Sequence, residues 1–185
     1  MHFPRELTLE TNRCRLRHVS EADFPHIWSA SRVAGFTDGM RWDPPKTLAE
    51  LAEPHQRALQ AWADDQAYQF TMEERAGGRF LGRIVIRRVP AAEVWNIGFW
   101  MHPREQGQGY MSEASQRILR FGFEELHAIR IEADHAVWNK ASGRVLQKLG
   151  MTFREFLPQG FQKQGQWVAE NRLAITREEW QASPR

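Results

Sequence analysis

The sequence predicts a mixed α/β domain built around a largely antiparallel sheet, and two observations carry this prediction. Three strand-like segments follow one another between residues 67 and 102 with only short turns between them, which is typical of an antiparallel meander. Residues 94–133 then show a strand, a helix and a second strand, the pattern of one parallel crossover. With 185 residues, the chain fits a single domain over residues 1–185 and is long enough to form a core.

The first elements are two strands and a helix. Residues 7–11 and 14–19 alternate apolar and polar side chains, as half-buried strands do. Ser20 can cap the helix that follows, with Asp23 as a weaker capping-box partner than glutamate, and this helix is expected to end near Val33.

The later elements follow from apolar periodicity and from glycine and proline signals. They are expected in this order: a loop over 34–46, a helix over 47–62, strands over 67–73, 79–87 and 94–102, a helix over 108–126, a strand over 129–133, a helix over 139–149, strands over 151–156 and 167–175, and a short helix over 176–180. Met111, Ala114 and Ile118 form part of the apolar stripe that a helix packed on a sheet needs. Gly150 suits the left-handed residue that closes the helix before it.

Composition narrows the class of protein. Apolar residues make up 42% and charged residues 26%, which is ordinary for a globular domain. A net charge of +2 without any long Lys/Arg run argues against a nucleic-acid partner. The single cysteine, Cys14, excludes an internal disulfide framework and a cysteine-based zinc site. The first residues do not resemble a signal peptide and no apolar run approaches a membrane span, so we expect a cytoplasmic protein with no membrane partner.

The most informative segment is residues 104–109, which joins a predicted strand to a predicted helix. Gly107 and Gly109 allow several backbone N–H groups to turn toward one point, and the helix that follows adds the positive end of its dipole. This combination predicts a cradle for an anion, most often a phosphate.

Three known phosphate loops compete for this segment. A P-loop requires Gly-Lys-Ser/Thr, but Tyr110 and Met111 stand there instead. A dinucleotide loop requires a third glycine, where Ser112 stands, and it normally opens a repeated parallel βαβ pattern. The third pattern, Gln/Arg-x-x-Gly-x-Gly/Ala of acetyl-CoA pyrophosphate loops, is matched in full by Arg104, Gly107 and Gly109.

Around this loop the chain resembles the GNAT N-acetyltransferase superfamily, and most closely its ribosomal-protein N-terminal acetyltransferase branch (RimJ/RimL-like). Residues 97–114 are similar to the strand, loop and helix block of that branch. Residues 139–151 are similar to its second block, Asn-x-x-Ser-x-x-Val-x-x-Lys-x-Gly-Phe, and residues 9–17 resemble its N-terminal motif. The resemblance implies the GNAT fold, with a central, mostly antiparallel twisted sheet of about seven strands flanked by about four helices.

The resemblance also implies an activity. It predicts an acetyl-CoA-dependent N-acetyltransferase, with no metal, that moves an acetyl group to a primary amine by direct attack in a ternary complex. The amine would be a protein N-terminal α-amine, a small amine or an amino-acid derivative. The alternative is a catalytically weak or inactive domain of the same fold that binds or senses CoA.

Site residues follow from the same resemblance. The positions expected to contact the cofactor are Trp100, Met101, His102, Gln106, Gly107, Gln108, Gly109, Tyr110, Met111, Asn139 and Ser142. The backbone N–H of Met101 would donate to the thioester oxygen, and Ser142 would protonate the departing CoA thiolate. Asn139 and Ser142 also fit the ordinary roles of a helix N-cap and a first-turn residue.

At the position of the base that would accept the amine proton, this sequence differs from the branch. Asn96 stands where the branch often has a glutamate, and it can only order a water. The wider superfamily often uses a tyrosine in the helix over 139–149, but this helix has none. The remaining candidates are Glu73, Glu74, Glu93, His102 and His135, each of which also fits a solvated surface residue.

The acceptor is expected to lie among aromatic residues. Trp28, Phe36 and Trp42 lie in or near the loop over 34–46, and a second loop over 158–165 faces it in the family. The same aromatic residues also suit a role in closing the core. His127, Asp134 and His135 lack the spacing of a metal site. Surface aromatic residues also allow a homodimer.

Overall fold

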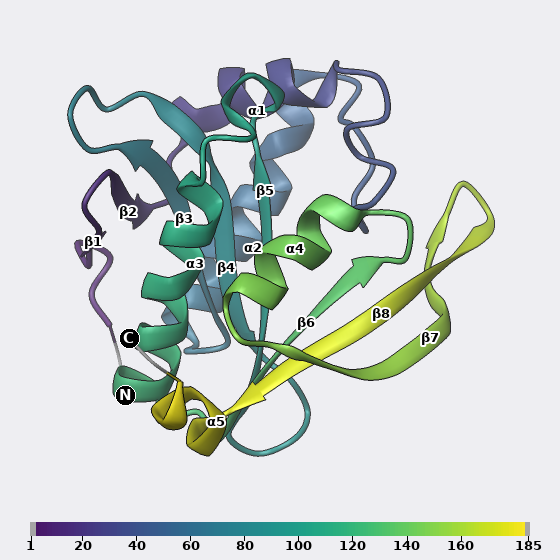
Figure 1. Ribbon diagram of the computed structural model, residues 1–185. Helices are drawn as coiled ribbons and strands as arrows, with labels where there is room; N and C mark the ends of the chain where they lie inside the picture. Colours follow the sequence, from purple (N-terminus) through teal and green to yellow (C-terminus); the bar gives the residue numbers. More distant parts are fainter. Residues whose placement is uncertain (1–2, 184–185) are drawn as a thin grey trace.

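In the computed structural model, which describes residues 3–183, the strands form one sheet in the order β1-β2-β3-β4-β5-β6-β8-β7 (Figure 1). The β5 and β6 strands pair in parallel, and every other neighbouring pair is antiparallel. The predicted antiparallel meander and the single crossover are therefore confirmed. Residues 1, 2, 184 and 185 of the expected domain lie outside the described residues.

The bounds of the elements follow the predicted order. The strands are β1 Leu9–Glu10, β2 Cys14–His18, β3 Ala67–Glu74, β4 Phe80–Arg88, β5 Val94–Met101, β6 Arg130–Ala136, β7 Thr152–Lys163 and β8 Gln166–Thr176. The helices are α1 Phe24–Ser31, α2 Ala52–Ala63, α3 Tyr110–Arg120, α4 Lys140–Lys148 and α5 Arg177–Ala182. Short 3-10 turns lie at Glu21–Asp23, Leu48–Leu51 and Pro103–Glu105, and a π turn at Phe121–Glu125 extends α3.

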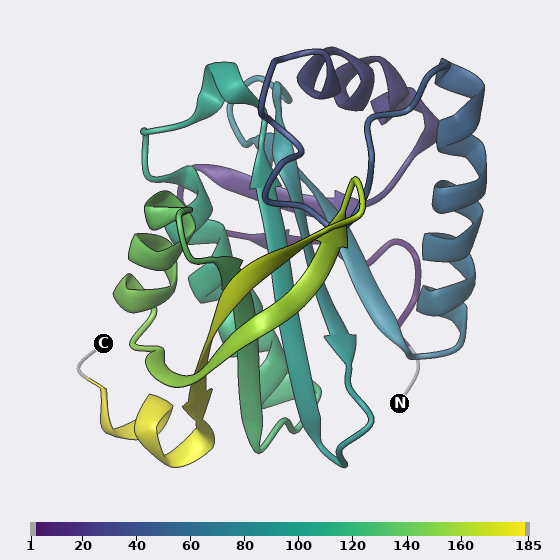
Figure 2. The ribbon, with the colours of Figure 1, turned by 90° about the vertical axis from the view of Figure 1, so that its right-hand side faces the viewer.

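Helices cover both faces of the sheet. The α3 and α4 helices lie on one face and α1 lies on the other (Figure 2). The α2 helix lies beside β3, where its Trp62 packs against Tyr68 and Phe70. The buried stripe of α3 includes Met111, Ala114 and Ile118, as predicted, and it belongs to the main core. Below α3, Gly122 allows a close approach, because an added Cβ would lie 2.6 Å from Ile131 Cδ1. Each fully buried aliphatic side chain of this core contributes about 1.5–3 kcal/mol.

The prediction of a loop over residues 158–165 is wrong for most of that range. The β7 strand continues to Lys163, and only the two residues Gln164 and Gly165, both with positive φ, form the turn to β8. The loop was expected from the family resemblance. Pro158, which cannot donate to a ladder, lies within β7. However, β7 is an edge strand, where proline is tolerated, and pairing with β8 resumes at Phe161 after an irregularity.

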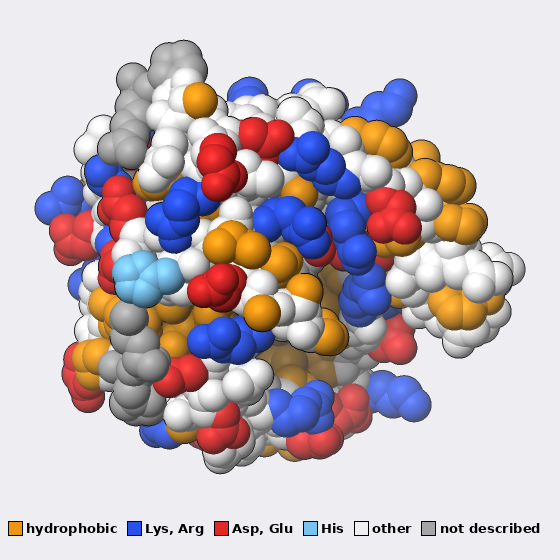
Figure 3. Space-filling view, turned by 90° about the horizontal axis from the view of Figure 1, so that it is seen from below, with side chains coloured by type: hydrophobic (Ala, Val, Ile, Leu, Met, Phe, Trp, Pro, Cys, Tyr) orange, Lys and Arg blue, Asp and Glu red, His pale blue; other side chains and the backbone are white. Residues whose placement is uncertain are grey.

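The β7–β8 hairpin also carries exposed aromatic side chains. Phe153, Phe156 and Trp167 are 59%, 53% and 51% exposed. Seen from below, hydrophobic side chains gather on the right-hand side over this hairpin, and Lys and Arg side chains border a hollow beside it (Figure 3). A homodimer that covers these side chains stays a prediction.

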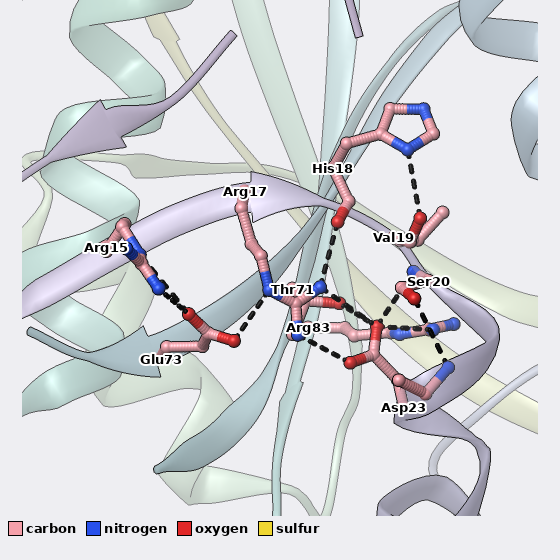
Figure 4. A network of polar contacts seen from close by, with 10 residues as sticks. Arg15, Arg17, His18, Val19, Ser20, Asp23, Thr71, Glu73 and Arg83 are labelled. Atoms are coloured by element: carbon pink, nitrogen blue, oxygen red, sulfur yellow. Dashed lines mark hydrogen bonds and ion pairs between the residues drawn. The ribbon is translucent and has the colours of Figure 1, made fainter. Parts of the chain in front are cut away.

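A buried network of charges ties α1 to β2, β3 and β4 (Figure 4). Asp23 receives hydrogen bonds from Arg17 (2.7 Å), Thr71 (2.6 Å) and Arg83 (3.3 Å). Burial opposes ionisation of Asp23, but the hydrogen bonds from Arg17, Thr71 and the Ser20 backbone outweigh it and lower its pKa. The predicted capping box of Ser20 and Asp23 is also present. The network fixes the helix from which the loop over 34–46 departs.

Candidate active site

A cleft opens where β5 and β6 diverge. Only Val94, Trp95 and Asn96 of β5 pair with β6, and beyond them the two strands separate. The resulting cleft has a volume of about 890 Å³. Its walls are residues 97–101 of β5, 133–135 of β6, 105–112 of the loop and helix that follow β5, parts of 138–148 around α4, and parts of 33–40. A strand pair that separates in this way leaves backbone groups available to a ligand.

The glycine cradle forms the wall at one end of this cleft. Gly107 and Gly109 have φ of +80° and +82°, values that other residues rarely adopt. Gly109 is the N-cap of α3 and offers no side chain to its N–H groups. The first intrahelical bond runs from the N–H of Glu113 to the Gly109 carbonyl (3.2 Å), so the three preceding N–H groups have no intrahelical acceptor. An added Cβ at Gly107 would meet no atom within 4 Å, so the space in front of the cradle is open. The cradle therefore fits an anion such as a pyrophosphate.

Two arginines, one in the β1–β2 turn and one in the β3–β4 turn, clamp the cradle. Arg13 donates to the Gln108 carbonyl (3.0 Å) and to Glu113 Oε2 (2.7 Å). Arg79, after the β3–β4 turn, forms ion pairs with Glu105 and Glu74. Sequence reasoning assigned no role to either arginine, although Arg13 belongs to the N-terminal motif.

Glu113 connects the clamp to the first turn of α3. Its carboxylate accepts hydrogen bonds from the Thr11 hydroxyl (2.6 Å) and from the Arg13 backbone N–H (2.7 Å). Burial opposes ionisation of Glu113, but these hydrogen bonds outweigh it and lower its pKa. Glu113 lies in the first turn of α3, where a carboxylate also favours the helix dipole. In the structure it also joins the cradle to the β1–β2 turn.

The edge of β5 offers a backbone donor to the cleft. The N–H of His102 donates to the Leu81 carbonyl of β4 (2.8 Å). Because successive peptide groups of a strand point to opposite sides, the N–H of Met101 points away from β4, toward the cleft. Trp100 and Met101 line the cleft, as do Gln106, Gly107, Gln108, Gly109, Tyr110 and Met111.

His102 lies outside the cleft wall, and its predicted contact with the cofactor stays a prediction. Its N–H is occupied by Leu81, its Nε2 lies 3.0 Å from the Ser29 hydroxyl, and its Nδ1 accepts from the Arg104 N–H (3.3 Å). Burial lowers its pKa, which favours the neutral ring. His102 therefore ties the start of the loop to α1.

The first turn of α4 forms the opposite wall. Asn139 and Ser142 both line the cleft, and Asn139 Oδ1 accepts the Ser142 N–H (3.1 Å) as an N-cap. Within residues 3–183, no hydrogen bond involves the Ser142 hydroxyl. His135 lines the cleft beside them and packs on this turn, because an added Cβ at Gly143 would lie 3.1 Å from its ring. Further along α4, Arg144 and Lys148 add two positive charges to the wall.

Asp134 is a cleft residue whose role sequence reasoning missed. It lies on β6 directly beyond the point of divergence, and Arg172 holds its carboxylate at 2.8 Å. Alternation along β6 was the available signal, because it places Asp134 on the face opposite the core residues Ile131 and Ala133. The structure thus brings the Asp134 carboxylate to the part of the cleft on the face that α3 and α4 do not cover.

Asn96 is buried and does not line the cleft. Its Oδ1 accepts two hydrogen bonds from the Arg87 guanidinium, at 3.0 and 3.1 Å. Its predicted function of ordering a water would therefore have to rely on its NH₂ group. The Arg87 guanidinium also lies beside Gly98, where an added Cβ would be 3.1 Å from Nη2.

The other candidate bases lie outside the cleft wall. Glu73 is held by Arg15 and Arg17, both at 2.6 Å. Glu74 accepts from the Tyr110 hydroxyl (3.1 Å) and pairs with Arg79. Glu93 is exposed in the β4–β5 turn with a φ of 55°.

The predicted acceptor aromatics divide into two groups. Phe36 lines the cleft and packs against Trp42 and Trp100, with ring centroids 6.1 and 5.5 Å apart. Trp42 also contacts Trp100 (6.3 Å) behind that wall. Trp28 lies outside the cleft wall, where the Arg32 guanidinium stacks on its ring at 4.2 Å.

The described residues offer neither a metal site nor a membrane-spanning helix. Across residues 3–183, no group of three or more His, Cys, Asp or Glu side chains is placed to hold a metal ion. In the same part of the chain, no helix combines the length and apolar character needed to cross a membrane.

Comparisons with known proteins agree with this geometry. The family model described as an acetyltransferase (GNAT) domain matches residues 13–152. An uncharacterized N-acetyltransferase of Bacillus subtilis, YnaD, is 35% identical over 116 residues, which cover 63% of this chain and 68% of that protein.

Two solved structures share the fold. RimJ of Mycobacterium smegmatis in complex with CoA-disulfide has a TM-score of 0.83 and 24% identity, covering 99% of this chain and 93% of that one. A putative ribosomal-protein-serine acetyltransferase from Vibrio cholerae has a TM-score of 0.82 and 21% identity, covering 94% and 99%.

Proposed function

Since the chain belongs to the acetyltransferase (GNAT) family and is an acyltransferase that uses acetyl-CoA, we propose that it acetylates a primary amine by direct attack in a ternary complex. The observation that carries the proposal is the cleft between β5 and β6. It places the glycine cradle, the Met101 N–H, Ser142 and Asp134 around one space.

The donor would occupy the side of the cleft that faces α3 and α4. The N–H groups of residues 106–111 would bind the pyrophosphate, with Arg144 and Lys148 adding positive charge nearby. The pantetheine arm would lie along the free edge of β5 at Trp100 and Met101, as an added strand does, with Asn139 facing it.

The transfer forms a carbon–nitrogen bond and breaks a carbon–sulfur bond. The amine must lose one proton, and the departing thiolate must gain one. The amine nitrogen attacks the thioester carbon, and the carbon–sulfur bond breaks. The Met101 N–H would stabilise the negative charge that develops on the thioester oxygen. Ser142 would give its hydroxyl proton to the departing thiolate and recover one from solvent.

Asp134 would receive the amine on the other side of the thioester. Its carboxylate can hold an ammonium group and accept its proton, directly or through a water. Arg172 fixes the orientation of the carboxylate at 2.8 Å. Asp134 thereby offers the carboxylate that Asn96 cannot supply.

A panel of primary amines tests the proposal. Purified protein with acetyl-CoA should release free thiol only when a suitable amine is present, and CoA alone should raise the melting temperature. If CoA raises the melting temperature but no amine releases thiol, the chain is a CoA-binding or sensing domain and the proposed reaction is wrong. If CoA has no effect on melting, the assignment of the cradle is wrong as well.

A further inference from the structure

Residues 34–46, called the strap here, cross the acceptor side of the cleft. The strap leaves α1, descends in front of the sheet and meets the tip of the β7–β8 hairpin (Figure 2). Phe36, Gly39 and Met40 of the strap line the cleft together with residues 97–101 and Asp134. The strap is therefore part of the wall that an acceptor must pass.

Lys163, near the tip of β7, ties the strap to the hairpin. Its ammonium group donates to the Trp42 carbonyl (2.7 Å) and the Met40 carbonyl (3.3 Å), and it pairs with Asp43 Oδ1 (2.8 Å). An ammonium group has three donors, so these contacts use all of them. The Lys163 side chain is only 11% exposed, whereas its partner Asp43 is 76% exposed.

A second tie connects the centre of the strap to β8. Arg41 pairs with Glu170 Oε2 at 2.5 Å and lies over the Phe161 ring at 5.5 Å. Glu170 is buried, at 4% exposure. The Gly160 backbone packs on the Glu170 side chain, because an added Cβ would lie 2.6 Å from Glu170 Cγ. A buried carboxylate needs a cationic partner, and the strap supplies it.

The strap also touches the first turn of α4. An added Cβ at Gly39 would lie 3.1 Å from the Trp138 ring and 3.4 Å from Asn139 Nδ2. Trp138 and Asn139 both line the cleft. The strap therefore spans the acceptor side of the cleft from α1 to α4, and the β7–β8 hairpin contacts it through Lys163 and Glu170.

We propose that the strap is a selectivity gate, held closed by Lys163 and by the Arg41–Glu170 pair, which restricts the acceptor to a primary amine on a compact apolar body. This inference rests on the proposed function. A folded protein that offers its N-terminus needs an extended groove for several residues, and the strap forms part of the wall along which such a segment would lie. Lys163, Arg41 and Glu170 are positioning residues in this account.

The chemistry of the wall favours the compact amine. Phe36, Met40 and Trp100 give it apolar contacts, and Asp134 gives one carboxylate for its ammonium group. The charges of Lys163 and Arg41 are already neutralised by Asp43 and Glu170. A polycationic acceptor would need several free carboxylates on this wall. Asp134 is the single carboxylate that the acceptor side contributes among the described cleft residues.

The test compares the Lys163→Met variant with wild-type protein and with Arg57→Met. Methionine keeps the length of the side chain and removes the donors. Arg57 pairs with Glu53 on the exposed face of α2, away from the cleft, and serves as the matched control. Hydrogen exchange of residues 34–46 is measured without any substrate. kcat/KM is then measured for a compact arylalkylamine and for a hexapeptide with a free N-terminus.

Strap exchange should rise about tenfold or more in Lys163→Met and stay unchanged in Arg57→Met. Wild-type protein should prefer the arylalkylamine, and Lys163→Met should shift the ratio of kcat/KM toward the hexapeptide about tenfold, through acceptor KM and with unchanged CoA affinity. The exposed Asp43→Asn variant should give a smaller shift in the same direction and replaces Lys163→Met if that variant does not fold.

Three results would overturn the inference. Unchanged strap exchange shows that Lys163 does not hold the strap, whatever the activity. Faster exchange with an unchanged acceptor ratio shows that the strap does not select. A wild-type preference for the hexapeptide contradicts the compact acceptor. Absence of thiol release with every amine is different, because it contradicts the proposed function while the exchange result still reports on the strap.

Discussion

The two ends of the cleft are built in different ways. The cradle takes its shape from local features, namely two glycines with positive φ and the start of a helix, and Arg13 and Arg79 then clamp it. The strap contains neither helix nor strand, and side chains more than a hundred residues away in the sequence hold it. The donor end is thus specified by a short motif. The acceptor end is specified by tertiary ion pairs, which can change without disturbing the cradle.

The largest effect is expected on stability, at the buried Asp23 network next to α1, the helix from which the strap departs. Asp23→Asn leaves Arg83 buried without its counter-charge, so the free energy of unfolding should fall by about 3 kcal/mol near neutral pH. Because folding lowers the pKa of Asp23, its contribution is present above the usual value of 3.8 and is lost as the pH falls through the folded-state pKa.

Urea unfolding from pH 7 to pH 3 measures this effect. The difference between wild-type and variant should shrink toward pH 3. Glu53→Gln, in the exposed pair with Arg57, is the control and should leave stability almost unchanged. An equal difference at all pH values would show that Asp23 does not act through its charge.

The next largest effect concerns the acceptor end. Asp134→Asn keeps the shape of the side chain and removes the proton acceptor, so kcat should fall about 100-fold or more. The affinity for CoA should stay the same, because Asp134 lies on the face away from α3 and α4. Steady-state kinetics and calorimetry measure the two quantities. An unchanged kcat would exclude Asp134 as the group that receives the amine proton.

A smaller effect is expected at the donor end. Gly109→Ala forces a residue with a Cβ into a φ of +82° at the N-cap of α3, so CoA should bind about tenfold more weakly. Gly165→Ala is the matched control, because its φ is +79°, an added Cβ meets nothing within 4 Å, and it lies in the hairpin turn. Equal CoA affinity in both variants would contradict the cradle.

The smallest expected effect is on stability at Glu170, whose pH dependence should be opposite to that of Asp23. Burial raises the pKa of Glu170 although Arg41 opposes this shift, and Asp134 and Arg172 act on it from the neighbouring strands. Its contribution to stability is therefore fully present below the usual value of 4.5 and is lost as the pH rises through the folded-state pKa. In urea unfolding, wild-type protein should lose stability relative to Glu170→Gln between pH 4.5 and pH 7. A trend in the opposite direction would show that Glu170 is held as a stabilised carboxylate, like Asp23.

The contrast between the ends explains what the sequence could predict. Period-two and period-3.6 patterns placed nearly every strand and helix, because burial imposes those periods. The cradle was predictable because a positive φ requires glycine at specific positions. The path of β7 was not, because the tolerance of Pro158 depends on its lying at the edge of the sheet.

Side-chain partners were the least predictable part of the site. His102 stands in the motif, yet its N–H bonds to Leu81 and its ring to Ser29. Asp134 was first considered only as a metal ligand, and its position at the divergence of β5 and β6 depends on the register of the sheet. Lys163 and Arg41 carry no motif at all, since their role depends on a contact between distant segments.

A crystal structure with bound CoA tests the central claim most directly. The account predicts that the pyrophosphate oxygens lie within hydrogen-bond distance of the backbone N–H groups of residues 106–111, and that the thiol lies between Met101 and Ser142. A CoA molecule bound elsewhere, with those N–H groups facing only solvent, would contradict it.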